Sequence, residues 1–386
     1  MITGLKNILR SRKLHLLAFL LVLLAITGCV PGTTAPKGWS GGAVADGTLY
    51  IGSMDGKIMA VNTTDGRRIW EAPLGTTAAP SGGFGCAAPA PQGVAIYGSP
   101  AVSANLVYIG GYNGKFYAFA PGEQEPRWVY PREGTIGSQI VGGALVAQDK
   151  VIFGAADGKV YALNAATGFS STGWIFPAGS GVGKIWSTPA YLDGTIFVGS
   201  FDKNLYALDI ATGEKKWSFA TQGAIASTPV AYNGTVYIGS FDRNLYAIDA
   251  TTGKEKWKFS GAKNWFWAKP LIKDNIIYAA NLDGKVYVLD AQSGNKLREF
   301  DMGGAISASP VLAGNTLIIA TESGNITAID TAGNTKKALR NLGEKVDAPL
   351  STDGTAVFIH TGAGKLYAVN AQSGAEVWPY ISLKSN

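Results

Sequence analysis

The sequence predicts an all-β fold, an eight-bladed β-propeller of four-stranded antiparallel blades. One segment type, written KVYA at 159–162 and NLYA at 204–207, occurs eight times, and successive copies end 58, 44, 45, 40, 41, 40 and 40 residues apart. Short apolar runs bounded by Asn-Gly and Asp-Gly pairs accompany the copies, and such runs are typical of antiparallel hairpins. No segment of the mature chain has helical periodicity, and four strands in a unit of about 40 residues match one propeller blade.

The N-terminus has the features of an export signal. Basic residues precede the apolar run 16–26, which is followed by Thr-Gly-Cys. The run is shorter than the ~20 apolar residues of a membrane-spanning helix. The stretch LAITGC resembles a bacterial lipobox, a signal whose cysteine, here Cys29, is lipidated and becomes the mature N-terminus. We therefore expect a signal peptide over 1–28 and a lipidated N-terminus with a short linker over 29–38; a plain signal peptide or a short uncleaved anchor is the alternative.

These features predict a protein outside the cytoplasm that is anchored by a lipid to the cell membrane or the outer membrane. Without residues 1–28 the chain keeps 29 Lys and Arg against 27 Asp and Glu, so its net charge falls from +6 to +2. No basic stripe is present, and we expect no nucleic-acid partner. Besides Cys29 the only cysteine is Cys86, so no intrachain disulfide is expected once Cys29 is lipidated.

The repeat divides the rest of the chain into blades. We expect the propeller over 39–381, with an irregular Gly-, Ala- and Pro-rich insertion over 75–93 and a C-terminal tail over 382–386. The first blade begins and the last blade ends in phase, so we expect no strand shared between the chain ends and a ring closed by packing of the eighth blade against the first. The eight blades are expected at approximately 39–74, 97–131, 140–177, 185–220, 225–260, 266–301, 306–341 and 346–381.

The lines GSFDKNLYALDIATGEKKW (199–217) and GSFDRNLYAIDATTGKEKW (239–257) resemble the PQQ-like, or quinoprotein-type, propeller repeat. The resemblance covers essentially all of 39–381. It implies that the tryptophan late in each repeat packs between blades. Copies ending NKLREF and TKKALRN lack this residue, so the sixth and seventh blades should be docked more weakly. The six structural tryptophans implied by the resemblance are Trp70, Trp128, Trp174, Trp217, Trp257 and Trp378.

The resemblance also raises the question of a cofactor. Quinoprotein dehydrogenases hold PQQ with a vicinal Cys-Cys disulfide, a Trp floor and a calcium ion bound by Glu, Asn and Asp. This chain has no Cys-Cys pair, so we expect no PQQ, no calcium and no enzymatic activity. His360 is the one histidine of the mature chain and lies on an apolar strand, which favours a core residue over a catalytic or metal-binding one.

Aspartates recur at one turn position of the blades, and this recurrence indicates turn chemistry rather than a catalytic pair. Asp and Asn tolerate the left-handed conformation, which is the reason we expect them there. Catalytic carboxylates would instead occur once. The aspartates are Asp55, Asp157, Asp202, Asp242 and Asp283.

An export signal followed by an eight-bladed PQQ-like propeller is similar to the layout of the family of the outer-membrane assembly lipoprotein BamB. The resemblance implies a non-enzymatic scaffold whose ring face binds another envelope protein or a polymer. Two alternatives stay open. One is a PQQ-dehydrogenase-like protein with a degenerate site, and the other is a propeller that binds cell-wall or other carbohydrate.

Candidate contact residues lie where the repeats differ most, in the loop that leads into each blade (the lead-in loop). Compared with GAIASTP (223–229), the loops GKIWSTP (183–189) and NWFWAKP (264–270) carry tryptophans near lysines. Amphipathic aromatics beside cations suit a partner or ligand surface. The alternative is that these tryptophans plug the channel of the ring. The candidates are Trp186, Trp265, Trp267, Lys184, Lys263 and Lys269.

Overall fold

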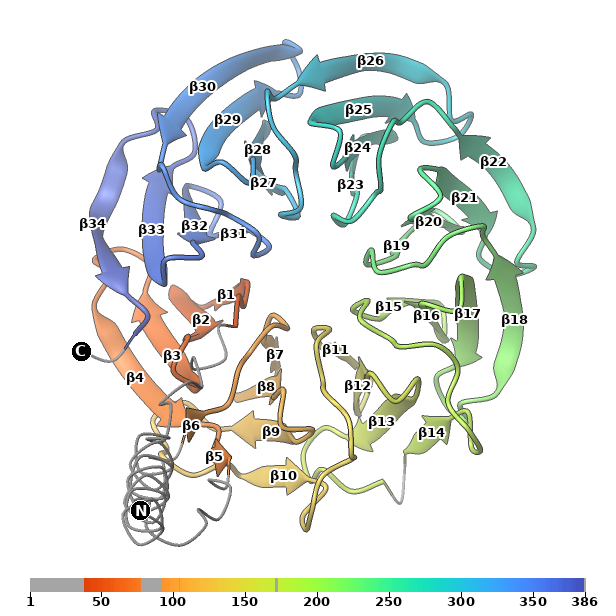
Figure 1. Cartoon of the computed structure of the whole chain (residues 1–386), viewed down its shortest axis with the longest axis vertical. Helices are drawn as coiled ribbons and strands as arrows, with labels where there is room; N and C mark the ends of the chain where they lie inside the picture. The colour runs from red at the N-terminus through yellow and green to blue at the C-terminus, as the bar shows by residue number, and fades with distance from the viewer. Residues whose placement is uncertain (1–37, 78–91, 104, 171–172, 385–386) are drawn as a thin grey trace, which may run out of the picture. The chain divides into compact units, whose positions relative to one another are not determined.

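The computed structural model describes residues 38–77, 92–103, 105–170 and 173–384. This part of the chain forms eight four-stranded antiparallel sheets arranged around one axis (Figure 1). The predicted eight-bladed all-β propeller is thus confirmed. No helix of the described residues could cross a membrane. The predicted signal peptide, the predicted lipidation site Cys29 and Cys86 lie outside the described residues.

Each of the first four blades is built from consecutive strands, the first nearest the axis and the fourth outermost (Figure 1). Blade 1 contains β1 (Gly42–Ala45), β2 (Thr48–Gly52), β3 (Lys57–Asn62) and β4 (Arg68–Pro73). Blade 2 contains β7 (Ala101–Ser103), β8 (Leu106–Gly110), β9 (Phe116–Phe119) and β10 (Trp128–Tyr130). Blade 3 contains β11 (Leu145–Ala147), β12 (Lys150–Gly154), β13 (Val160–Asn164) and β14 (Trp174–Phe176). Blade 4 contains β15 (Ala190–Leu192), β16 (Thr195–Gly199), β17 (Asn204–Asp209) and β18 (Lys215–Ala220).

The other four blades follow the same plan. Blade 5 contains β19 (Val230–Tyr232), β20 (Thr235–Gly239), β21 (Leu245–Asp249) and β22 (Glu255–Phe259). Blade 6 contains β23 (Leu271–Lys273), β24 (Ile276–Ala280), β25 (Lys285–Asp290) and β26 (Lys296–Asp301). Blade 7 contains β27 (Val311–Ala313), β28 (Thr316–Ala320), β29 (Asn325–Asp330) and β30 (Thr335–Asn341). Blade 8 contains β31 (Ser351–Thr352), β32 (Ala356–His360), β33 (Lys365–Asn370) and β34 (Glu376–Ser382).

The insertion between blades 1 and 2 is described only at its two ends. These ends pair as a small two-stranded sheet of β5 (Thr76–Thr77) and β6 (Gln92–Gly93). The part between them, 78–91, lies outside the described residues. The segment expected to be irregular therefore begins and ends with antiparallel pairing.

The recurring turn aspartates hold the turn between the second and third strands of a blade. In blade 4, Asp202 Oδ1 accepts the N–H of Asn204 at 3.0 Å and Asp202 Oδ2 accepts the hydroxyl of Tyr206 at 2.6 Å. Burial and the neighbouring Asp202 carboxylate raise the pKa of Tyr206. The predicted reason for the aspartates was incomplete, because the left-handed residue is the next one, here Lys203 with φ 76°. The side chain of Asp202 serves as an acceptor.

Two blades place a long cation where the others place glycine. Lys203 and Arg243 have φ of 76° and 72°, whereas Gly158 and Gly284 occupy the same turn position at 77° and 86°. A non-glycine residue pays about 1–2 kcal/mol for the left-handed conformation, and glycine loses about 0.5–1 kcal/mol through its freer unfolded state. We predict that Lys203→Gly and Arg243→Gly each raise the free energy of unfolding by up to about 1 kcal/mol, measured by urea titration. A loss of stability in both variants would contradict this.

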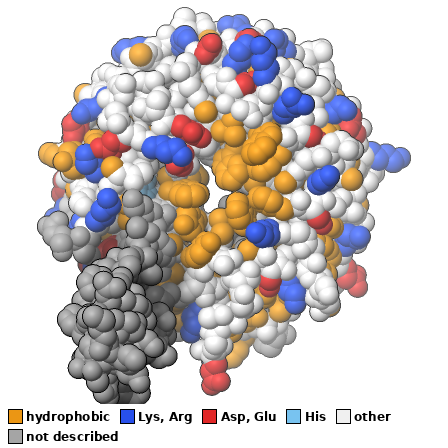
Figure 2. All heavy atoms as spheres, viewed as in Figure 1, with side chains coloured by type: hydrophobic (Ala, Val, Ile, Leu, Met, Phe, Trp, Pro, Cys, Tyr) orange, Lys and Arg blue, Asp and Glu red, His pale blue; other side chains and the backbone are white. Residues whose placement is uncertain are grey.

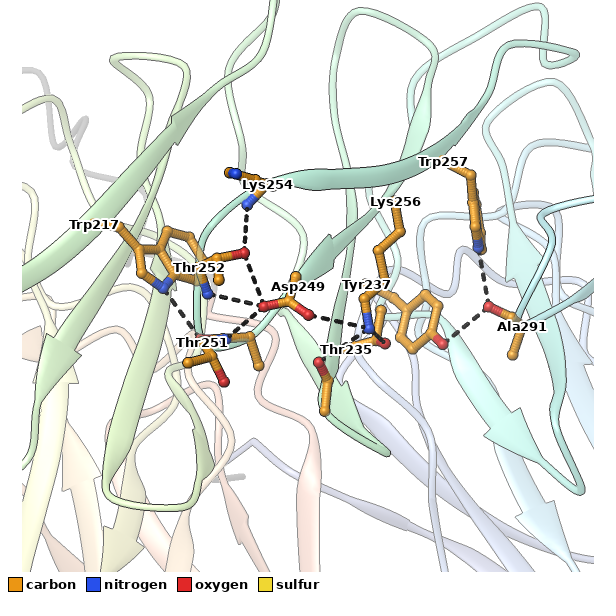
Figure 3. Close-up of polar contacts among 12 residues, drawn as sticks. Trp217, Thr235, Tyr237, Asp249, Thr251, Thr252, Lys254, Lys256, Trp257 and Ala291 are labelled. Carbon is orange, nitrogen blue, oxygen red and sulfur yellow. Dashed lines mark hydrogen bonds and ion pairs between the residues drawn. The ribbon is translucent and has the colours of Figure 1, made fainter.

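Neighbouring blades are joined by an indole of one blade and a Thr-Gly-type turn of the next. Trp217 Nε1 donates to the carbonyl of Ala250 at 3.1 Å, and Trp257 Nε1 donates to that of Ala291 at 3.0 Å (Figure 3). A Cβ added to Gly253, whose φ is +70°, would lie 2.6 Å from the Trp217 ring. The turn therefore needs glycine both for its backbone conformation and for its close approach to the indole.

Six of the eight blade boundaries have such an indole hydrogen bond. The donors and acceptors are Trp70 and Glu123, Trp128 and Ala165, Trp174 and Ile210, Trp217 and Ala250, Trp257 and Ala291, and Trp378 and Thr63. In blade 6 Arg298 stands in register where Trp257 stands in blade 5. In blade 7 Lys337 takes that place, and its ammonium donates to the carbonyl of Gln372 at 3.2 Å.

The ring closes between blade 8 and blade 1 without a shared strand, since each blade consists of its own four strands. Trp378 donates to Thr63 at 3.1 Å, and the carbonyl of Leu383 accepts the N–H of Met54 at 3.0 Å. Leu383 and Trp378 belong to one apolar cluster with residues of blade 1 such as Leu49. Packing of blade 8 on blade 1 thus closes the ring, as the repeat phase predicted.

This closing boundary also reverses a small-large pairing that recurs around the ring. At other boundaries the second strand ends in a small residue that lies against a bulky residue of the next lead-in loop; for example, a Cβ at Gly199 would lie 2.2 Å from Ile225 Cγ2. At the closure His360 replaces the small residue and Gly38 replaces the bulky one. A Cβ at Gly38 would lie 2.1 Å from the carbonyl oxygen of Ile96, so only glycine fits there.

His360 is buried, and its Nδ1 lies 2.9 Å from the carbonyl oxygen of Ser40 in the first lead-in loop. Because a carbonyl only accepts, Nδ1 carries the proton in the neutral ring and donates it to Ser40. Nε2 has no hydrogen-bond partner among the described residues. Burial lowers the pKa of His360 to about 4, opposed by the bond to Ser40.

Candidate binding face

One face of the ring carries both the lead-in loops and the turns between second and third strands, because successive strands of a blade run in opposite directions. Backbone hydrogen bonds hold these two loops of a blade together. The N–H of Phe201 donates to the carbonyl of Lys184 at 2.9 Å, and the N–H of Leu282 donates to that of Trp265 at 3.1 Å. We call this the lead-in face.

A continuous cluster of aromatic rings lies on the lead-in face over blades 4 to 6, and we call it the aromatic rim. Trp265 stacks on Phe241 with ring centroids 4.5 Å apart, and Trp267 lies 5.5 Å from the same phenyl ring. Phe201 joins them to Trp186, at 5.9 Å from Phe241 and 4.7 Å from Trp186. Trp265 is 45 % exposed. Figure 2 shows hydrophobic side chains gathered around the mouth of the ring on one face.

Four exposed cations, which we call the rim cations, flank the aromatic rim. The ammonium of Lys184 lies 5.9 Å from the Trp186 ring centroid. Lys203 and Arg243 extend from the same turns as the two phenylalanines, and Lys263 precedes Trp265 in its lead-in loop. Within the described chain none of the four forms an ion pair. An aromatic surface beside unpaired cations suits an acidic partner that also presents apolar side chains.

Phe201 and Phe241 were missing from the residues predicted from the sequence. They come from the turns between strands, whereas the candidates came only from the lead-in loops. A comparison of that turn position would have found them, because the aligned residues are Met54, Tyr112, Ala156, Phe201, Phe241, Leu282, Glu322 and Gly362. Phenylalanine occupies this position only in blades 4 and 5, and the tryptophan-bearing lead-in loops of the aromatic rim are those of blades 4 and 6.

The predicted lysines do not form one group. All three lysines are exposed, but Lys269 lines the central channel, whereas Lys184 and Lys263 lie outside its wall. The alternation of an extended chain explains the difference. In each lead-in segment one residue faces the channel, the next is buried between blades, and the one after faces the channel again, as in Trp267, Ala268 and Lys269.

The channel wall therefore has two tiers around a cavity of about 230 Å³. The upper tier consists of Trp39, Tyr97, Val141, Trp186, Ala226, Trp267, Ser307 and Asp347. Lower-tier residues that line the cavity are Ser99, Gly143, Thr188, Thr228, Lys269, Ser309 and Pro349. Trp186 and Trp267 thus belong both to the wall and to the aromatic rim, while Trp265 is not part of the wall.

The wall does not fit a PQQ–calcium site. Calcium takes six to eight oxygen ligands, usually with several carboxylates, but the cavity is lined by one carboxylate, Asp347. That carboxylate pairs with Lys345 at 3.0 Å and accepts the hydroxyl of Ser307 at 3.2 Å. No group of three or more His, Cys, Asp and Glu side chains in the described chain could hold a metal ion.

Comparison with known proteins agrees with this fold. The family model for the outer membrane protein assembly factor BamB matches residues 31–172 and 156–380. BamB from Moraxella catarrhalis is 20% identical, with a TM-score of 0.64 over 86% of this chain and 92% of that one. The computationally designed protein Ika8 is 19% identical, with a TM-score of 0.68 over 88% of this chain and 95% of the other. A search of curated proteins finds no match. The chain, which the family model covers over most of its length, belongs to the BamB family of PQQ-like propellers.

Proposed function

We propose that the protein is a non-enzymatic scaffold of the cell envelope, anchored through a lipid on Cys29, that takes part in outer-membrane protein assembly. The name of its family supports the process. The aromatic rim and the rim cations support the mode of action, because a rigid ring presents them together on one face. A propeller fold alone hosts both enzymes and binding proteins, so the proposal depends on this surface rather than on the fold.

The observation that carries the proposal is the exposed stack of Trp265 on Phe241 among unpaired cations. Large aromatic side chains and arginine dominate the energetics of many protein interfaces. The expected partner is an envelope protein whose contact surface combines carboxylates with apolar side chains. The cations would speed its association and select it, while the aromatic rings would supply the buried area.

The proposal can be tested by gene deletion and complementation. We predict that the deletion strain contains less folded β-barrel protein in its outer membrane, and that the native gene restores it. The double variant Trp186→Ala/Trp267→Ala should restore about half or less, because truncating central aromatic residues commonly removes more than 1 kcal/mol of binding energy each. We expect the amount of barrel protein that the variant restores to fall clearly, and its melting temperature to change much less. If it unfolds early and still restores assembly, the two tryptophans serve only the channel wall.

Lys203→Gly combined with Arg243→Gly separates binding from stability, since we expect this variant to be at least as stable as the native protein. It should nevertheless restore less barrel protein, because two rim cations are lost. Lys254→Ala is the matched control: it removes an exposed cation of blade 5 from the opposite face. Equal restoration by the Gly variant and the control would contradict the role of the rim cations.

A further inference from the structure

The lower tier of the channel wall contains a cation and hydroxyl groups without a carboxylate. Lys269 lines the cavity, and its ammonium forms no hydrogen bond or ion pair with any described residue. The surrounding channel wall partly desolvates the ammonium of Lys269 and so lowers its pKa, although the side chain remains exposed to the solvent of the channel. Among the described residues that line the cavity, Asp347 in the upper tier is the one carboxylate, and it is already paired with Lys345. The cation of Lys269 is thus uncompensated.

The hydroxyls beside Lys269 are oriented by their neighbours. Thr188 Oγ1 accepts the N–H of Gly143 at 3.0 Å, and Thr228 Oγ1 accepts that of Thr188 at 3.4 Å. Ser309 Oγ accepts the N–H of Lys269 at 3.0 Å. Each oxygen therefore accepts a hydrogen bond from an N–H of the preceding lead-in segment, and its own O–H has no acceptor among the described residues. These hydroxyls remain donors for a group in the cavity.

A third observation comes from the upper tier. The indole Nε1 of Trp186 is buried and has no hydrogen-bond partner within the described chain. A buried N–H without an acceptor is costly, and the side chains that line the cavity supply none. Trp186 and Trp267 line the same cavity as Lys269 and offer flat apolar surfaces above it.

We propose that this cavity binds a small organic monoanion. Its carboxylate lies against Lys269 and the hydroxyls of Thr228 and Ser309, and its flat apolar body lies between the indoles of Trp186 and Trp267. The cavity of about 230 Å³ suits one small molecule. This site shares Trp186 and Trp267 with the aromatic rim. Lys269, Thr228 and Ser309 belong to the channel wall alone, so variants of Lys269 distinguish this site from the proposed role in protein assembly.

The test uses benzoate as the probe, with titrations of the purified full-length protein by calorimetry and tryptophan fluorescence. Benzamide supplies the same ring without charge, and acetate supplies the carboxylate without the ring. We expect benzoate to bind at least about tenfold more tightly than either, because both the charge and the stacking contribute. Equal binding of benzamide would overturn the anion site, and equal binding of acetate would overturn the role of the indoles.

Variants of Lys269 test whether this residue supplies the positive charge that binds benzoate. Lys269→Met should weaken benzoate binding about tenfold or more, whereas Lys263→Met, which removes an exposed rim cation outside the cavity, should change it less than about twofold. Lys269→Arg retains the charge and should keep the preference for benzoate over benzamide. This variant therefore separates the loss of charge from a folding defect caused by substitution at this position. Benzoate affinity should also fall as the pH rises through the lowered pKa of Lys269. Unchanged benzoate binding by Lys269→Met would overturn the proposal.

Discussion

Replacing Trp378 with alanine is expected to destabilise the ring at its closure and to lower the free energy of unfolding by about 3–5 kcal/mol. Trp378 is 4% exposed, donates to the carbonyl of Thr63 at 3.1 Å and lies against Gly66, where an added Cβ would be 2.7 Å from the ring. Alanine would leave a cavity and an unsatisfied carbonyl. The energy is measurable by denaturant titration.

The strands that lose hydrogen-exchange protection in Trp378→Ala test the account of ring closure as directly as the change in unfolding free energy does. Hydrogen exchange should show lost protection in β1 to β4 and β31 to β34, the two blades that meet at Trp378. The matched variant Trp217→Ala has the same kind of contact, with Ala250 and Gly253, and should lose protection in blades 4 and 5. If Trp378→Ala leaves blades 1 and 8 as protected as in the native protein, the account of ring closure is wrong.

The second large effect is a loss of stability in acid that originates at His360. Its pKa is lowered to about 4 in the folded protein, against about 6.5 in an unfolded chain. The unfolded state therefore binds the proton first as the pH falls below 6.5. The resulting loss of unfolding free energy, relative to neutral pH, grows as the pH falls and reaches about 3 kcal/mol at pH 4. Stability should thus be lost between pH 6.5 and 4 and retained above that range.

His360→Asn provides the comparison. The amide of asparagine can still donate to the carbonyl of Ser40, but it does not titrate. We expect the variant to be less stable than the native protein at neutral pH, and the cost of the substitution itself should not change with pH. Its stability should then fall less steeply than that of the native protein between pH 6.5 and 4, measured by urea titration at several pH values. Identical slopes for the two proteins would show that His360 does not control the acid response.

The number of blades and their topology could be predicted from the sequence because each repeat contains the residue pairs that form its turns. Each Asn-Gly or Asp-Gly pair marks a turn, and each apolar run between turns is too short for a helix. The need for packing at the ring closure followed from the phase of the first and last copies. Both features can be read from the order and spacing of the repeats along the chain, which a single sequence shows directly.

The candidate site was only partly predictable, because it depends on contacts between blades. Phe241 belongs to blade 5, yet it stacks on Trp265 of the loop that leads into blade 6. Lys263 and Lys269 are six positions apart in one loop, but only Lys269 lies in the channel wall. The role of His360 was also hidden, since its partner Ser40 lies 320 positions away and is brought close only by ring closure.

The central claim, that the lead-in face over blades 4 to 6 captures an envelope protein, is tested most directly by site-specific photo-crosslinking in living cells. A photoreactive residue at Lys184 samples the lead-in face, and one at Glu214 samples the opposite face of the same blade; both native residues are exposed. We predict a discrete protein adduct from position 184 that Trp265→Ala reduces, and none from position 214. An adduct from position 214 that is as strong as that from 184, or one from 184 that Trp265→Ala leaves unchanged, would contradict the claim.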